Sequence, residues 1–299
     1  ADGFTFSGNS YDNTGALYRR YWSGGTLYRV LARNGLGQDL EYELADGRTV
    51  TREYDHGFLE RIHAGDVQDL HMAYDFNTGN MDYRWDAMQL LKESFGYDEL
   101  NRLTDARLNT TDFGGGIIGN DISYYDYGYD GAINDHTRGG LILRSDIGQL
   151  PHDNRVSAAK HINYPQPYNQ PPAVISQDTQ KITYTPFLKT ATINELVGGD
   201  NYHLTYEYGL EQQRVRSVLT KNNTDPAERI YLGEYEQQIQ NSITQEMHYI
   251  AGGSGLASII VRTGNVWQAY AAYTDHLGSP VVLTSAANGT IVAEQNFDP

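Results

Sequence analysis

The 299-residue sequence contains no cysteine. This absence excludes disulfide bridges, thiolate metal sites and a cysteine nucleophile. The sequence also lacks any run of about 18 apolar residues, the length that a membrane-spanning helix needs. It begins Ala1-Asp2-Gly3-Phe4, without an initiator Met and without the charged and then apolar pattern of a signal peptide. We therefore expect a chain that begins inside a longer product and has no membrane span.

Positive charge is scarce. The chain has 22 Lys and Arg against 38 Asp and Glu, which gives a formal net charge of −16. A surface of this sign repels phosphate backbones and anionic lipids, so we expect no binding of nucleic acid by the bulk surface. The charge fits a protein kept dispersed by self-repulsion, and it also fits an acidic wall that attracts a basic partner.

Proline is rare and unevenly placed, because five of the nine prolines fall between Pro151 and Pro172. Proline cannot donate to a β-ladder, so this stretch predicts a loop or an edge that interrupts the sheet. We interpret residues 151–180 as an insertion loop. A proline-rich ligand for a partner protein is the weaker alternative.

Tyrosine and glycine are abundant, with 24 and 31 residues respectively. This composition favours strands joined by tight turns over long surface helices. Alternating runs at 27–31, 40–44, 202–208 and 258–262 predict strands, and Asp46-Gly47 between two such runs predicts a hairpin. The sequence therefore predicts an all-β fold built from antiparallel hairpins.

A Tyr-Asp dipeptide followed by a short turn and an apolar residue recurs along the first half of the chain. The copies begin at Tyr11-Asp12, Tyr54-Asp55, Tyr74-Asp75 and Tyr97-Asp98. The steps from Tyr54 to Tyr74 and from Tyr74 to Tyr97 are 20 and 23 residues, a spacing typical of an array built from one repeated supersecondary unit.

Each residue of the repeat has a physical role. We expect the tyrosine to end a strand with its ring on a sheet face and the aspartate to open the turn. Glycine then takes the left-handed position, and Asn101 replaces it in the fourth copy because asparagine tolerates positive φ well. The repeat thus predicts architecture and not catalysis.

Tyr97-Asp98-Glu99-Leu100-Asn101-Arg102-Leu103 resembles the YD repeat of the Rhs family of bacterial polymorphic toxins, related to toxin-complex C subunits and teneurins. The last third of the chain strengthens this resemblance. The run from Asp275 and His276 through Gly278 to Pro280, within Tyr273-Thr274-Asp275-His276-Leu277-Gly278-Ser279-Pro280, resembles the Rhs repeat-associated core.

The resemblance implies a spiralling antiparallel β-sheet of repeated hairpins that forms part of a hollow Rhs-type shell. It implies a YD-repeat array over 1–150, the insertion loop over 151–180, and a continuing array with the associated core over 181–299. It further implies a secreted or cell-surface bacterial protein that encapsulates and delivers a C-terminal toxin domain of the same precursor. Upstream repeats or a secretion apparatus would be its other partners.

We find no signature of a catalytic, cofactor-binding or metal site in the sequence. Asp275 and His276 could form an acid-base pair, but we interpret them as structural residues of a turn. Asp298 in Asp298-Pro299 is a weak candidate, since family members that self-cleave use aspartates of Asp-Pro motifs near this border, and an aspartyl autoproteolytic element is therefore one alternative. A cell-surface adhesin or glycan-binding array, in which exposed tyrosines stack on sugar rings, is the other.

Overall fold

The computed structural model describes residues 6–111, 117–127, 133–138, 141–144, 158–163 and 173–295. Every regular element in these ranges is a β-strand. Within them, no helix is both long and apolar enough to cross a membrane. The predicted all-β fold of antiparallel hairpins is confirmed.

The strands form two sheets, and in both of them the strand order follows the order of the chain. The first sheet has 13 strands: β1 (Phe6–Tyr11), β2 (Leu17–Trp22), β3 (Gly25–Arg33), β4 (Asp39–Leu44), β5 (Thr49–Asp55), β6 (Phe58–Ala64), β7 (Gln68–Tyr74), β8 (Met81–Asp86), β9 (Leu91–Tyr97), β10 (Leu103–Thr111), β11 (Ile117–Tyr127), β12 (Ile133–Arg138) and β13 (Leu141–Arg144).

The second sheet has 12 strands: β14 (Ala158–Asn163), β15 (Ala173–Tyr184), β16 (Thr190–Val197), β17 (Asp200–Tyr208), β18 (Arg214–Lys221), β19 (Thr224–Leu232), β20 (Tyr235–Gln240), β21 (Ile243–Gly252), β22 (Gly255–Thr263), β23 (Val266–Thr274), β24 (Pro280–Ser285) and β25 (Ile291–Glu294). Neighbouring strands pair antiparallel, as in the ladder that joins Tyr83 to Ser94 and Arg84 to Glu93. Each sheet is therefore a continuous meander of hairpins.

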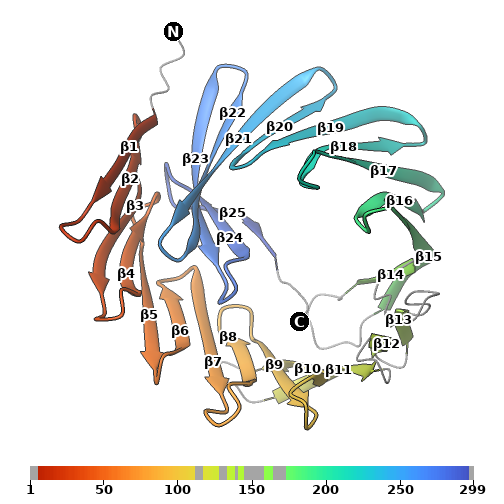
Figure 1. Cartoon of the computed structure of the whole chain (residues 1–299), viewed down its shortest axis with the longest axis horizontal. Helices are drawn as coiled ribbons and strands as arrows, with labels where there is room; N and C mark the ends of the chain where they lie inside the picture. Colours follow the sequence, from red (N-terminus) through yellow and green to blue (C-terminus); the bar gives the residue numbers. More distant parts are fainter. Residues whose placement is uncertain are drawn as a thin grey trace.

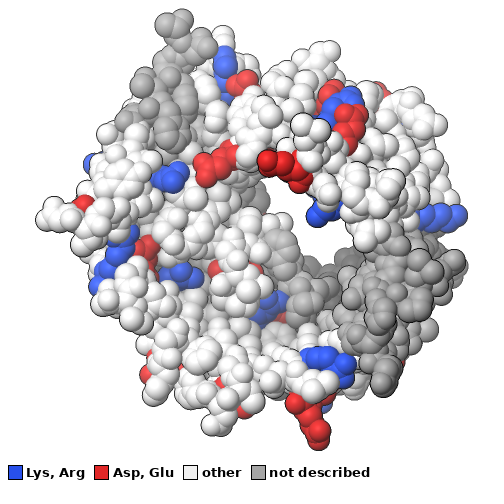
Figure 2. Space-filling model, viewed as in Figure 1, with Lys and Arg blue, Asp and Glu red and all other residues white. Residues whose placement is uncertain are grey.

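The two sheets together bend into a ring (Figure 1). The first sheet, coloured red to yellow-green, forms one side, and the second, green to blue, returns along the other side until β22–β25 reach β3–β7. The space-filling view shows an opening through the middle of the molecule, with acidic and basic side chains along its margin (Figure 2). The strands β24 and β25 lie on the inner side of the ring.

The hydrophobic core lies where the end of the chain meets its beginning. One cluster joins Tyr28, Leu44, Val50 and Ile62 of the first sheet to Tyr273 and other residues of the second. Further members of this cluster are Val30, Tyr42, Ala64, Val67, Leu70, Met72, Ala257, Ala271 and Val282. We call this packing of β22–β24 on β3–β7 the closure.

The opposite arc of the ring is a single layer of sheet. Between residues 180 and 249 the described residues include no buried hydrophobic side chain, and the buried residues there are Ser217 and Glu236. Apolar burial is the main force that favours folding, at about 25 cal/mol per Å². Among the residues that the structure describes, the closure therefore supplies most of the apolar burial that stabilises the fold.

The division of the chain into the segments 1–150, 151–180 and 181–299 stays a prediction. The strands β14 and β15 fall partly or wholly within 151–180, where the sequence predicts an insertion loop. All five prolines of that stretch lie outside the described residues. The runs that form these strands, at 158–163 and 173–184, carry no proline, and their backbones are free to pair.

Candidate functional site: the repeat turns and the closure

Three of the four Tyr-Asp copies form related hairpin turns. The turns at Asp12 and Asp98 have the same length, and the turn at Asp75 is one residue longer, because the Asp75 amide donates to the Asn80 carbonyl at 2.9 Å. In the copy at Asp98, the Asp98 amide donates to the Arg102 carbonyl at 3.0 Å, and the Asn101 amide donates back to the Asp98 carbonyl at 3.0 Å. Asn101 has a φ of 60°. The matching positions in the copies at Asp12 and Asp75 are Gly15 and Gly79, with φ of 83° and 78°. The turn is therefore closed by a left-handed residue, as the sequence predicts.

The aspartate of the repeat caps the turn with its side chain. Asp98 Oδ1 accepts hydrogen bonds from the amides of Leu100 and Arg102, both at 2.9 Å, and Oδ2 accepts from Arg102 Nε at 2.7 Å. Asp12 Oδ1 accepts from the Thr14 amide at 2.8 Å, and Asp75 Oδ1 accepts from the Asn77 amide at 2.9 Å. Hydrogen bonds from these turns lower the pKa of Asp12, Asp75 and Asp98.

The copy at Tyr54-Asp55 differs from the other three. Asp55 pairs directly with Phe58, so the loop has only two residues, His56 and Gly57, with φ of 49° and 89°. Positive φ at both positions is the signature of a type I′ turn. Asp55 Oδ2 contacts His56 Nδ1 at 2.9 Å. The shorter distance between the aspartate and the next apolar residue allows this tighter turn.

The tyrosines at the ends of strands link each hairpin to the one before it. Tyr97 donates its hydroxyl to the carbonyl of Met81 at 3.1 Å, and Tyr127 donates to that of Leu103 at 2.8 Å. Met81 and Leu103 are each the first residue after the preceding repeat turn. In addition, the Arg102 guanidinium lies 4.6 Å from the centre of the Tyr127 ring.

The other three tyrosines of the repeat lie in different surroundings. Tyr54 is half-buried and pairs with Leu59 of β6. Tyr74 stacks on Phe58 with ring centres 4.8 Å apart, and burial raises its pKa. Tyr11 is 60% exposed. The Tyr74 ring therefore packs against another ring and the Tyr11 ring lies largely in solvent, and the role of the repeat tyrosines as packing units stays a prediction.

The turn at Asp275 belongs to the same class. Its Oδ1 accepts from the amides of Leu277 at 2.9 Å and Ser279 at 2.8 Å, and Gly278 has a φ of 86°. Burial lowers the pKa of His276, and its buried Nδ1 has no hydrogen-bond partner among the described residues. Asp275 and His276 are thus a turn cap and a desolvated imidazole, with no hydrogen bond between them in the described part of the chain. Pro280 begins β24 directly after this turn.

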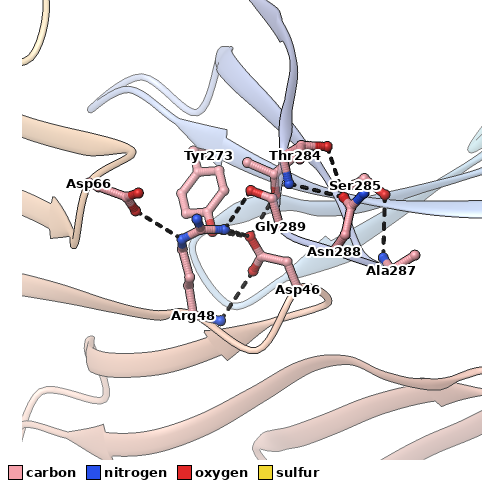
Figure 3. A network of polar contacts seen from close by, with 10 residues as sticks. Asp46, Arg48, Asp66, Tyr273, Thr284, Ser285, Ala287, Asn288 and Gly289 are labelled. Atoms are coloured by element: carbon pink, nitrogen blue, oxygen red, sulfur yellow. Dashed lines mark hydrogen bonds and ion pairs between the residues drawn. The ribbon is translucent and has the colours of Figure 1, made fainter.

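A buried aspartate of another turn holds the closure together (Figure 3). Asp46 Oδ2 accepts from Thr284 Oγ1 at 2.6 Å, from Tyr273 Oη at 2.8 Å and from Arg48 Nη1 at 2.8 Å. Arg48 Nη1 also donates to the Gly289 carbonyl at 2.9 Å. This cluster, which we call the Asp46 latch, joins the β4–β5 turn to β23, β24 and the turn that follows β24.

The latch shifts the acid-base properties of its members. Burial raises the pKa of Asp46, but the hydrogen bonds from Thr284, Tyr273 and Arg48 outweigh burial, and the net pKa lies below its ordinary value of 3.8. Burial and the Asp46 hydrogen bond raise the pKa of Tyr273 well above that of a free tyrosine. The latch therefore contains an ionised Asp46 and a neutral Tyr273 at neutral pH.

A second polar cluster of the closure surrounds Asp39. Tyr28 donates its hydroxyl to Asp39 Oδ2, and Arg33 Nε donates to Asp39 Oδ1 at 2.7 Å. The β21–β22 turn lies directly on this pair. A Cβ atom on Gly253 would lie 2.2 Å from Asp39 Oδ2, and one on Gly252 would lie 2.7 Å from the Tyr28 ring. Glycine is required here because the backbone itself packs on the polar pair.

Two further hydrogen bonds cross the closure. Ser258 Oγ donates to the Leu27 carbonyl at 2.8 Å, and Gln68 Nε2 donates to the Thr274 carbonyl at 2.9 Å. The sequence does not predict either contact, since a hydrogen bond between residues 206 or 231 positions apart leaves no local pattern.

The described residues contain no group of three or more His, Cys, Asp or Glu residues placed to hold a metal ion. The weak candidate Asp298 lies outside the described residues. What the described residues bring together is a set of turn caps and a closure.

No protein-family profile and no curated protein sequence matches this chain. Solved structures do match. A crystal structure of TcdB2-TccC3-TEV has a TM-score of 0.66 at 16% identity, and a crystal structure of TcdB2-TccC3 has a TM-score of 0.60 at 14% identity. A Photorhabdus luminescens Tc holotoxin pore with a mutation in TccC3 has a TM-score of 0.68 at 14% identity.

Each of these matches covers 97% of this chain but only 16% to 18% of the matched chain. The chain therefore spans less than a fifth of the length of the toxin-complex chains that it resembles. With identities this low, the likeness concerns the fold. The ring of antiparallel hairpins is a fold that this chain shares with these toxin-complex structures.

Proposed function

We propose that this chain is a non-enzymatic segment of the shell of a secreted bacterial Rhs-type toxin. In the full-length precursor, the shell encloses a C-terminal toxin domain and keeps it from solvent until delivery. The partners in this role are that toxin domain and the neighbouring repeats or secretion apparatus. The fold likeness to toxin-complex structures supports a shell-like role.

The observation that carries the proposal is a closed ring whose last described strand lies inside it. The strand β25 is the edge of the second sheet and pairs only with β24 in the strand order. It lies on the inner side of the ring (Figure 1). A chain that continues from β25 would therefore begin on the inner side of the ring.

Protease protection tests this function. The natural precursor that extends past residue 299 is digested with a nonspecific protease, and we expect its C-terminal domain to survive far longer than the same domain expressed alone. Asp46→Ala removes the acceptor of the latch and should shorten this protection. Asp66→Ala is the matched control, because the Asp66 side chain is 79% exposed and its one ion pair with a described residue joins it to Arg48 Nε at 3.2 Å.

Two results would contradict the proposal. One is a C-terminal domain digested equally fast with and without the shell segment. The other is an equal loss of protection in the Asp46 and Asp66 variants, because the closure would then have no part in enclosure.

Expression of the same extended protein tests the alternative function, autoproteolysis at Asp298. A single uncleaved band from the parent protein would exclude self-cleavage at this border. Cleavage that is abolished in Asp298→Asn would establish it.

A further inference from the structure

Two hairpins of the second sheet keep the geometry of the repeat turn but lose its sequence. Thr185 and Gly209 occupy the position of the capping aspartate, as the hydrogen bonds of the β15–β16 and β17–β18 turns define it. The left-handed positions hold Leu188 and Gln212, with φ of 67° and 59°. Neither residue favours this conformation, because it brings the Cβ atom of an L-residue close to the following carbonyl oxygen. Strain of this kind persists where a side chain is needed in place.

Both strained side chains line the same pocket of about 450 Å³. The rest of the lining comes from the β15–β16 turn and from the ends of β16 to β19, in the upper right of Figure 1: Lys189 of the turn, and Thr190, Tyr208, Arg214 and Tyr231 of the strands. A volume of this size lies within the range of small-molecule sites. The two departures from the repeat therefore meet at one concave surface.

The pocket is electropositive within an acidic chain. Its lining contains two cations, Lys189 and Arg214, and no Asp or Glu. Neither cation pairs with a carboxylate of the described residues, whereas Arg102, Arg216 and Lys221 all do so. The replacement of the turn aspartate by Thr185 and Gly209 removes the two carboxylates that the repeat would place here.

Aromatic rings hold the arginine and form one wall. The Arg214 guanidinium lies 4.1 Å from the centre of the Tyr206 ring and 5.6 Å from that of Tyr231. Tyr208 is fixed by its hydroxyl, which donates to the Thr190 carbonyl at 2.6 Å, and by an edge contact with Phe187 at 5.5 Å. Among the described residues, Arg214 donates no hydrogen bond. Its N–H groups can therefore serve a ligand.

We propose that this pocket binds an acidic monosaccharide unit, such as a sialic or uronic acid residue. The carboxylate of the sugar forms ion pairs with Arg214 and Lys189. The Arg214 guanidinium can bind the carboxylate through two parallel hydrogen bonds, in a bidentate geometry. The apolar face of the sugar ring lies against Tyr208 and Tyr231. Thr190 and Gln212 supply hydrogen bonds to hydroxyl groups. The inference goes beyond the proposed shell role and does not depend on it.

Ligand-observed NMR titration of the full chain tests this site, with N-acetylneuraminic acid and glucuronic acid as probes and galactose as the neutral comparison. We expect saturable binding of at least one acidic sugar and none of galactose. Arg214→Gln and Lys189→Gln should each raise Kd about tenfold, the effect of losing one hydrogen bond to a charged group. Lys221→Gln, on the same strand but bonded to Asp200, should leave Kd unchanged.

Lys189 is an exposed turn residue, so its variant keeps the test decisive if Arg214→Gln fails to fold. The proposal is overturned if neither acidic sugar binds saturably, or if Lys221→Gln weakens binding as much as the pocket variants. It is also overturned if inorganic phosphate displaces the acidic sugars with a Kd equal to theirs, because the pocket would then recognise the negative charge and not the sugar ring.

Discussion

Tyrosine in this fold acts through its hydroxyl as much as through its ring. Tyr97, Tyr127 and Tyr208 each donate to a carbonyl of the first residue after the preceding turn. Those carbonyls belong to the first residue of a strand, where the neighbouring strand no longer supplies a backbone N–H donor. Arg33 takes the same place in the first hairpins and donates to the Leu17 carbonyl. The last residue of the paired strand therefore carries a long side chain with a hydrogen-bond donor, which is a tyrosine in three of these four cases.

Tyr97→Phe should destabilise the protein by about 1 kcal/mol, the net value of one hydrogen bond, because the ring stays and only the donor is lost. Urea denaturation measures this change. Tyr83→Phe is the control, since the Tyr83 hydroxyl makes no hydrogen bond among the described residues and its ring packs under Lys92. Equal effects of the two substitutions would show that the hydroxyl of Tyr97 does not link the hairpins.

The hairpin is the unit on which sequence reasoning succeeds. Asp98 and Asn101 define a turn by local chemistry, and a side chain that bonds an amide two positions away can be predicted from the sequence alone. The repeat motif does not predict the turns at Thr185 and Gly209, because these two residues replace the capping aspartate, and Leu188 and Gln212 replace the left-handed glycine. Their signal is the preceding tyrosine: Tyr184 and Tyr208 are 24 residues apart, close to the spacing of the clear copies.

Asp98→Ala should loosen the β9–β10 turn while the two strands stay paired. The Leu100 and Arg102 amides lose their shared acceptor, so their hydrogen exchange should become faster than in the parent protein. Exchange measured by NMR or mass spectrometry over residues 98–102 checks this. Glu99→Ala changes the adjacent exposed residue and should leave these amides as protected as before. Equal acceleration by both variants would mean that the cap does not hold the turn.

The ring as a whole depends on contacts that the sequence could not reveal. The Asp46 latch joins residues 227 and 238 positions apart, and Asp46 looks in the sequence like an ordinary hairpin residue. Chain entropy opposes bringing such distant segments together, so the contacts must be strong once formed. The latch and the apolar cluster of the closure meet at Tyr273, whose ring packs in the cluster and whose hydroxyl bonds Asp46.

Acid should weaken the closure through Asp46. Because its pKa in the folded protein lies below the ordinary 3.8, the carboxylate contributes stability that is fully present above this value and is lost as the pH falls through the lower, folded pKa. Asp46→Asn removes this contribution at every pH. The difference in Tm between parent and Asp46→Asn should therefore be constant from neutral pH down to about pH 5 and shrink below about pH 4.

Asp66→Asn provides the control for this titration, because its exposed carboxylate should give only a small Tm difference at any pH. A parent-to-variant difference for Asp46→Asn that stays constant, or widens, as the pH falls below 4 would contradict an ionised latch. A shrinking difference, together with faster hydrogen exchange confined to β23 and β24, would locate the acid-sensitive step at the closure. Because the opposite arc between residues 180 and 249 lacks a buried apolar layer, the loss of this one contact should open the ring before the individual hairpins unfold.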